Sequence, residues 1–131
     1  MNEQTLKAQL VKELRFFLPN FVIIRHEDRI TSGIPDISIT GHKIGSWWEV
    51  KNANPKFASK GIQELMMLRL ANSGFAYYVV YYDYQDVQRT YIVDPKDIKK
   101  PIDTWKVFVP GFDHRWIVLQ VKDLHTFRSR T

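Results

Sequence analysis

Two short segments of alternating polar and apolar residues, Pro35–Thr40 and Ser46–Lys51, constrain the fold of this chain more than any other feature. A period of two is typical of a β-strand, whose successive side chains point to opposite faces of a sheet. Only Gly41-His42-Lys43-Ile44-Gly45 separates the segments, and this stretch suits a turn. The pattern therefore predicts an antiparallel hairpin with one apolar and one polar face.

The register of this hairpin decides which side chains meet. The residues of the predicted apolar face are Ile37, Ile39, Trp48 and Val50. If His42-Lys43 is the turn, the numbers of facing residues sum to 85, and Asp36 lies opposite Glu49. Their Cβ atoms would then be about 4.5–5.5 Å apart. A sum of 87 would also keep Asp36, Glu49 and Lys51 on one face, whereas an even sum would separate the two acids.

The predicted polar face brings two carboxylates together, and these repel each other unless a cation or a proton lies between them. They can chelate one divalent ion, with metal–oxygen distances of roughly 2.0–2.1 Å for Mg²⁺. Lys51 follows Glu49 at about 6.6 Å along the strand, where its ammonium would aid a water molecule or a developing oxyanion. The alternative is a solvated face with an ordinary Glu-Lys pair, and the residues alone leave both interpretations open.

Residues 3–18 predict a helix whose apolar stripe also contains an acid. The stripe consists of Leu6, Leu10, Leu14 and Phe17. Glu3 falls inside this stripe, and an acid that faces a core needs a partner, which a metal can supply. The alternative is a terminal residue that only interacts favourably with the helix dipole.

Residues 59–73 predict a second helix, with Ser59 as its N-cap and Gly74 after its end. The apolar residues that share a face with Gln63 are Met66, Met67 and Leu70. A buried Gln needs hydrogen bonds. Gln63 therefore either binds backbone nearby or reaches the carboxylates.

The order of the predicted elements is helix, three strands, helix, strand. Phe21–Ile24 and Phe75–Tyr82 are apolar runs that predict the first and fourth strands. Beyond residue 83 the sequence predicts three further strands, at 89–93, 104–109 and 115–121, and a short turn that opens at 94–95. The 131 residues contain no repeats or long linkers, so we expect one α/β or α+β domain over residues 1–131.

Composition excludes several kinds of protein. The chain has no Cys, which rules out disulfides and thiolate metal sites. No apolar run approaches the ~18 residues of a membrane span, and the polar N-terminus is unlike a signal peptide. We therefore expect an intracellular, cytoplasmic protein, of a size that would suit a virus or a mobile element. The net charge of +5 permits a polyanionic partner.

Several segments together resemble a known nuclease signature. Gly33-Ile34-Pro35-Asp36-Ile37 and Trp48-Glu49-Val50-Lys51 resemble the motif of the PD-(D/E)XK nuclease superfamily. With Glu3-x-x-Leu6, Arg25-His26, Gln63 and Gly74 in the same order, the chain is similar to the VRR-NUC branch and, more loosely, to archaeal-type Holliday-junction resolvases. The match covers about residues 3–82. It implies a restriction-endonuclease-like core with a mixed sheet flanked by helices, to which residues 83–131 add a C-terminal extension.

The resemblance implies a role for each matching residue. Asp36 and Glu49 would hold Mg²⁺ or Mn²⁺ together with the Val50 carbonyl, and Glu3 would complete the acidic shell. Lys51 would orient or activate the water. Gln63 would position Lys51 or the water. The implied activity is a metal-dependent endonuclease that hydrolyses DNA phosphodiesters in recombination or repair. Its substrate would be a Holliday junction, a flap or other branched DNA. The protein would act as a homodimer and would need no small-molecule cofactor.

Basic residues near the predicted site would contact the DNA backbone. These candidates are Arg25, His26, Arg29, Lys56, Lys60 and Arg69. The segment Asn52-Ala53-Asn54-Pro55-Lys56 lacks the Gly-Arg that usually follows Glu-x-Lys in this superfamily, so the DNA path departs from the family pattern.

Three other functions stay open at this point. One is a catalytically weak nucleic-acid-binding module on the same fold, and another is a partner-dependent subunit that binds through the aromatic strand Tyr77–Tyr84. The third is sequence-specific, restriction-type cleavage.

Overall fold

A computed structural model describes residues 2–27, 33–53 and 61–128. The helices are α1 (Glu3–Phe17), α2 (Gly61–Ser73) and α3 (His114–Arg128). The strands are β1 (Val22–Arg25), β2 (Ile37–Gly41), β3 (Ile44–Ala53), β4 (Phe75–Tyr84), β5 (Val87–Val93) and β6 (Phe108–Pro110). Two short 3-10 turns, η1 (Pro95–Asp97) and η2 (Ile102–Thr104), lie between β5 and β6.

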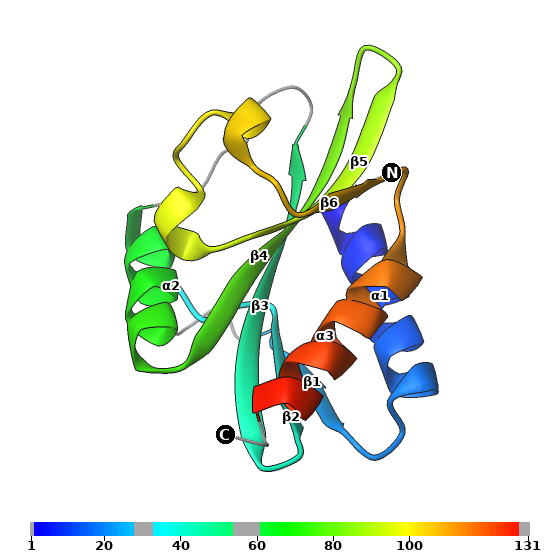
Figure 1. Cartoon of the computed structure of the whole chain (residues 1–131), viewed down its shortest axis with the longest axis vertical. Helices are drawn as coiled ribbons and strands as arrows, with labels where there is room; N and C mark the ends of the chain where they lie inside the picture. The colour runs from blue at the N-terminus through cyan, green and yellow to red at the C-terminus, as the bar shows by residue number, and fades with distance from the viewer. Residues whose placement is uncertain (1, 28–32, 54–60, 129–131) are drawn as a thin grey trace.

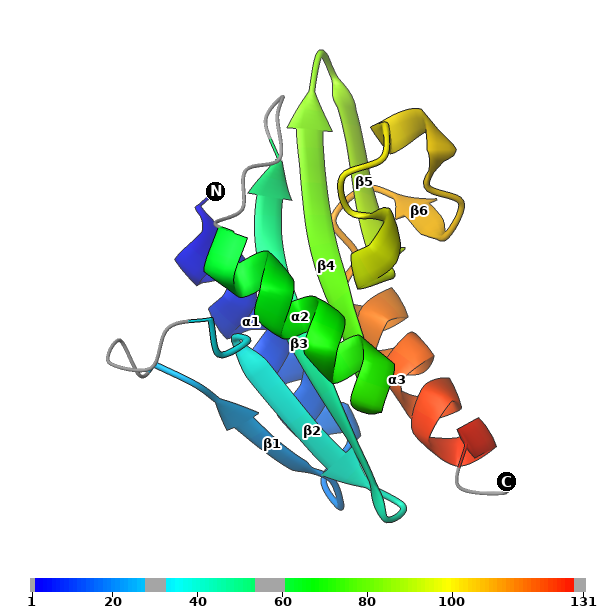
Figure 2. The same ribbon diagram turned by 90° about the vertical axis from the view of Figure 1, so that its left-hand side faces the viewer.

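The described strands form one six-stranded mixed sheet in the order β1-β2-β3-β4-β5-β6. All neighbours are antiparallel except β3 and β4, which are parallel and are connected through α2. Helix α2 covers one face of the sheet, and α1 and α3 lie side by side on the other (Figures 1 and 2). The predicted α+β class and the order helix, three strands, helix, strand are confirmed.

The hydrophobic core lies on both faces of the sheet. The core under α1 and α3 includes Leu6, Leu10, Leu14, Ile37, Ile39, Trp48, Val50, Ile117 and Val121. The core under α2 and the 3-10 turns includes Ala53, Met67, Tyr78, Val80, Tyr91 and Trp105. The predicted apolar face of the hairpin therefore packs against α1 and α3, and its polar face turns toward α2.

The hairpin of β2 and β3 has the predicted register. Ile37 pairs with Trp48 and Gly41 pairs with Ile44, so the numbers of paired residues sum to 85. His42 and Lys43 form the turn with φ angles of 52° and 65°. Such left-handed angles at both central residues are those of a tight hairpin turn whose twist matches the twist of the strands.

Two of the predicted C-terminal strands are wrong. Arg115–Val121 lies within α3, where Ile117, Val118 and Val121 are buried on one helical face. A short apolar run rich in β-branched residues fits a strand or a buried helix equally well. Asp113 accepts a hydrogen bond from the Trp116 amide (2.9 Å) and so supports the first turn of the helix, whose apolar face is buried.

The predicted strand over 104–109 is mostly wrong as well. Thr104 ends η2, and only Phe108–Pro110 forms a strand, β6, which pairs with β5. The indole of Trp105 is buried and donates to the Asp97 carbonyl (2.9 Å), which holds this segment against η1 instead of in the sheet. The expected N-cap of α2, Ser59, lies outside the described residues.

None of the described helices has both the length and the apolar character needed to cross a membrane.

Candidate functional site

Asp36 lies at the point where β2 begins, and both of its carboxylate oxygens have partners. Oδ2 accepts a hydrogen bond from the Val50 amide (2.9 Å), and Oδ1 forms an ion pair with Lys7 Nζ (2.7 Å). The Asp36 carbonyl also accepts from the His26 amide (2.7 Å), which ties the end of β1 to this position. The backbone and side chain of Asp36 are therefore held by three different elements.

Glu49 lies opposite Asp36, as the register predicted, and it is almost completely buried at 2% exposure. Its Oε1 accepts from the Asp36 amide (3.0 Å). Its Oε2 lies 3.4 Å from Lys51 Nζ and accepts a hydrogen bond from Gln63 Nε2. The structure thus brings four of the predicted site residues together, namely Asp36, Glu49, Lys51 and Gln63.

The electrostatics of Glu49 follow from this crowding. Burial and then the nearby Asp36 carboxylate raise the pKa of Glu49 from 4.5 to about 8, although the Lys51 ammonium acts in the opposite direction. A carboxyl group in this setting holds its proton near neutral pH, or gives it up when a cation arrives. The polar face of the hairpin is therefore no ordinary solvated strand surface.

Glu3 approaches the same region from α1. Its Oε1 accepts a hydrogen bond from the Asn52 amide (3.0 Å), so the acid that we predicted on the core-facing stripe binds the backbone of β3. This contact is two residues beyond the Val50 amide that binds Asp36. Glu3 and Asp36 therefore reach β3 next to each other, from different elements.

Lys7 is a site residue that the sequence reasoning missed. It lies one turn after Glu3 on α1 and is 7% exposed, and it pairs with Asp36. A signal was present, because Lys7, Val11 and Leu14 share one helical face, and Val11 and Leu14 are apolar. A lysine beside an apolar stripe usually extends its ammonium to solvent, so the pattern alone does not identify a buried partner.

The structure describes only some of the residues that we predicted to contact DNA. Arg25 donates to Gln4 Oε1 (2.7 Å) and pairs with Glu27 (3.3 Å). His26 Nε2 lies 2.8 Å from Ser38 Oγ, and its ring lies against Trp47. Both therefore bind within the protein. Of the other candidates, Arg69 is exposed on α2, whereas Arg29, Lys56 and Lys60 lie outside the described residues.

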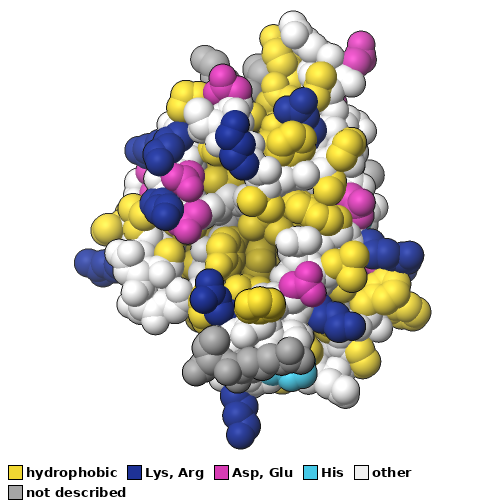
Figure 3. Space-filling model, in the orientation of Figure 1, with side chains coloured by type: hydrophobic (Ala, Val, Ile, Leu, Met, Phe, Trp, Pro, Cys, Tyr) yellow, Lys and Arg dark blue, Asp and Glu magenta, His cyan; other side chains and the backbone are white. Residues whose placement is uncertain are grey.

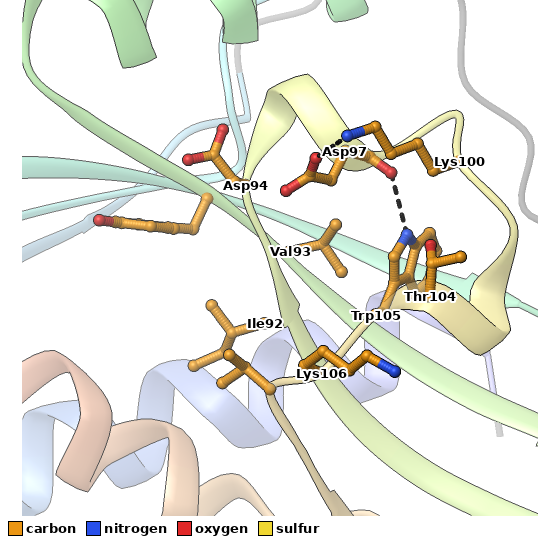
Figure 4. Close-up of a pocket in the computed structure, with 10 residues that line it drawn as sticks. Ile92, Val93, Asp94, Asp97, Lys100, Thr104, Trp105 and Lys106 are labelled. Atoms are coloured by element: carbon orange, nitrogen blue, oxygen red, sulfur yellow. Dashed lines mark hydrogen bonds and ion pairs between the residues drawn. The ribbon is translucent and has the colours of Figure 1, made fainter.

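Two hollows in the described part of the surface lie elsewhere. Pockets of about 360 and 430 Å³ adjoin each other and share Tyr77, Ile92 and Val107. Figure 3 shows apolar side chains gathered in a hollow on this face, and Figure 4 shows the smaller pocket, where Asp97 pairs with Lys100 (2.8 Å). Neither pocket is lined by Asp36 or Glu49, so both are separate from the candidate site between α1, α2 and the hairpin.

The donors of the site fit a hard divalent cation. Among the described residues, no three His, Cys, Asp or Glu side chains lie close enough together to hold an ion. Asp36 and Glu49 nevertheless place two carboxylates together, and the Val50 carbonyl is an oxygen donor in the same strand. Mg²⁺ is commonly bound through one or two carboxylates and keeps several waters. Burial, and then repulsion by Asp36, raise the pKa of Glu49, and a cation would relieve the second of these effects.

The fold is shared with a solved structure described as Hjc, a Holliday junction resolvase from Archaeoglobus fulgidus, an archaeal hyperthermophile. The similarity covers 93% of this chain and 98% of that chain, with a TM-score of 0.54 and 13% sequence identity. No protein-family model matches the chain, and no curated protein matches its sequence. At this identity the likeness shows the fold alone, a mixed sheet flanked by helices.

Proposed function

We propose that this protein is an endodeoxyribonuclease that requires Mg²⁺ or Mn²⁺ and cleaves branched DNA. The observation that carries the proposal is the contact of Asp36, Glu49, Lys51 and Gln63 on a fold shared with a structure described as a Holliday junction resolvase. Membership of the PD-(D/E)XK superfamily and likeness to its VRR-NUC branch are part of the same proposal. They rest on the motif residues and on the fold.

The residues would divide the work of phosphodiester hydrolysis. Asp36, Glu49 and the Val50 carbonyl would hold the ion, and Glu3 would add negative charge nearby. When bound, the ion would polarise a phosphate oxygen and lower the pKa of the attacking water. Lys51, whose ammonium is 3.4 Å from Glu49, would orient that water and stabilise the charge that develops as the P–O bond breaks.

Gln63 would keep Glu49 and Lys51 in place. Its amide binds Glu49 Oε2, the same oxygen that faces Lys51. Because Gln63 comes from α2 and the acids come from the hairpin, this contact ties the helix to the reacting groups. A positioning role predicts that Gln63→Ala lowers the cleavage rate more than it lowers DNA affinity.

The substrate class is inferred from charge and symmetry. A net charge of +5 favours a polyanion. A four-way junction has two strands to cut, and a two-fold symmetric dimer would present one site to each of them. We therefore infer that a homodimer acts on branched DNA, and that binding weakens strongly as the salt concentration rises.

Cleavage of labelled DNA tests the proposal directly. A panel of single strand, duplex, flap and four-way junction would be incubated with the whole chain in Mg²⁺, in Mn²⁺ and in EDTA. Glu49→Gln removes one ligand charge, and Asp103→Asn, an exposed acid in η2, is the matched control. We expect the wild type and Asp103→Asn to cut branched DNA with metal, and Glu49→Gln to bind but not cut.

A nucleic-acid-binding module on the same fold is the second candidate. One observation favours it: each oxygen of Asp36 and Glu49 already has a partner within the protein. A module of this kind would bind branched DNA equally well with and without divalent ions, and it would leave every member of the panel intact.

A further inference from the structure

The ion pair between Lys7 and Asp36 occupies the place where the proposed metal would bind. Lys7 Nζ lies 2.7 Å from Asp36 Oδ1, and the side chains are only 9% and 16% exposed. The other oxygen, Oδ2, accepts from the Val50 amide. Because that amide belongs to β3, Asp36 cannot turn Oδ1 away from Lys7 without losing its contact with the strand.

An ion on Oδ1 would lie very close to the ammonium. A metal–oxygen distance of about 2.1 Å and the Lys7 contact limit the separation of the two cations to about 5 Å. Like charges at that distance in a poorly solvated place strongly disfavour each other. Because both would bind the same oxygen, Asp36 Oδ1, Lys7 and the ion compete for it.

Both acids of the site have a lysine neighbour within the chain. Asp36 pairs with Lys7, and the Glu49 carboxyl group lies 3.4 Å from Lys51 Nζ. The two lysines differ in origin, because Lys51 comes from the hairpin itself and Lys7 comes from α1. Because Lys7 belongs to α1, its side chain could leave Asp36 while β2 and β3 keep their pairing.

We propose that Lys7 is a resident cation of this site, which a divalent ion must displace from Asp36 before the carboxylate can bind that ion. Lys7 thereby sets the metal concentration at which the site fills. The inference rests on the proposed metal site. It adds a competitor residue from α1 and a change in the contacts of Lys7 when metal binds.

Titration of the whole, metal-stripped chain with Mn²⁺ tests this exchange by calorimetry, without any nuclease assay. Lys7→Gln removes the charge but keeps a hydrogen-bond donor for Asp36, so the carboxylate stays satisfied. Lys12→Gln is the matched control, since Lys12 is an exposed lysine of the same helix. We expect Lys7→Gln to bind Mn²⁺ about tenfold more tightly than the wild type, which corresponds to about 1.4 kcal/mol, and Lys12→Gln to bind like the wild type.

The wild type supplies an independent readout through acetylation of its lysines, mapped by mass spectrometry. Lys7 is 7% exposed and should react slowly in EDTA. Displacement by Mn²⁺ should make it react faster, whereas exposed Lys12 should be unaffected. Acetylation of the wild type also tests the displacement of Lys7 if the Lys7→Gln variant does not fold, that is, if its circular dichroism spectrum differs from that of the wild type.

The outcomes separate the two proposals. If the wild type binds Mn²⁺ and Lys7→Gln binds no more tightly, or Lys12→Gln tightens binding equally, the displacement is refuted and the metal site stands. Continued protection of Lys7 at saturating Mn²⁺ also refutes it. If neither the wild type nor Lys7→Gln binds Mn²⁺, the metal site fails, and the inference fails with it.

Discussion

Raising the pH should destabilise the metal-free protein, and Glu49 should be the cause. In the folded protein the pKa of Glu49 is raised to about 8, whereas its ordinary value is 4.5. Between these pH values the folded protein holds a proton that the unfolded chain has lost. The contribution of Glu49 to stability is therefore full below about pH 4.5 and is lost as the pH rises through about 8.

The size of the effect follows from the same shift. The interval between 4.5 and about 8 corresponds to roughly 5 kcal/mol at about 1.36 kcal/mol per pKa unit. Relaxation of the site around the charged form lowers this figure, so we expect a loss of about 2–5 kcal/mol. That is a large part of the stability of a small domain, which is about 5–15 kcal/mol.

Other groups contribute little or with the opposite sign. Burial lowers the pKa of His114 and His125, so their contribution is lost as the pH falls, and they stabilise the protein as the pH rises through about 6.5. Burial raises the pKa of Tyr78 and Tyr81 above the ordinary value of 10, which keeps them neutral in this range. The difference between the wild type and Glu49→Gln isolates the acid.

Urea unfolding in EDTA from about pH 5 to about pH 9 measures the effect. The free energy of unfolding of the wild type should fall relative to that of Glu49→Gln, which has no proton to lose at this position. Mn²⁺ at the alkaline end should restore stability to the wild type more than to the variant, because a ligand of the folded state stabilises that state. Parallel pH profiles of the two proteins would refute the reasoning.

Three further predictions concern single side chains. Lys51→Met should lower the rate of junction cleavage by about 10²–10³-fold while binding in Ca²⁺ is retained, and an unchanged rate would remove Lys51 from the mechanism. Gly41→Ala should lower the unfolding free energy by about 1–3 kcal/mol, because an added Cβ would lie 2.6 Å from the Phe21 ring; thermal unfolding measures this, and Phe21→Leu in the same background should recover part of the loss. His125→Ala should cost about 2–4 kcal/mol in urea, since buried His125 contacts Ser46 Oγ (2.7 Å) and the Gly41 carbonyl (3.0 Å); a loss below about 1 kcal/mol would show that these contacts are weak.

The hairpin and α1 were predictable because both have clear periods. Alternation over Ile37–Gly41 and its partner strand predicts which residues share the apolar face, and a turn at His42 and Lys43 then selects the register with a sum of 85. The run at residues 115–121 was not predictable in this way, since its length and β-branched content suit two structures. The capping acid Asp113 was the better indication of a helix in this segment. The helix forms because it buries Ile117 and Val121 in the core that α1 also covers.

The candidate site was only partly predictable, for a different reason. Asp36, Glu49 and Lys51 belong to one local element, so a pattern of period two places them. The contacts of Lys7 with Asp36 and of Glu3 with Asn52 join α1 to the hairpin across the fold. A sequence pattern indicates that such residues face the core, but the docking of α1 decides which groups they meet there.

The end of β2 explains why the site forms at this place. Pro35 has no amide hydrogen and precedes Asp36, so β2 cannot extend its ladder beyond Ile37, whereas β3 continues to Ala53. Beyond the last pair of this ladder, the carboxylates of Asp36 and Glu3 accept hydrogen bonds from the amides of Val50 and Asn52. Each carboxylate keeps lone pairs for a cation after this bond. The missing length of β2 thus orients two acids at one edge of β3, beside buried Glu49, and it is this edge that a divalent ion and the Lys7 ammonium would compete to occupy.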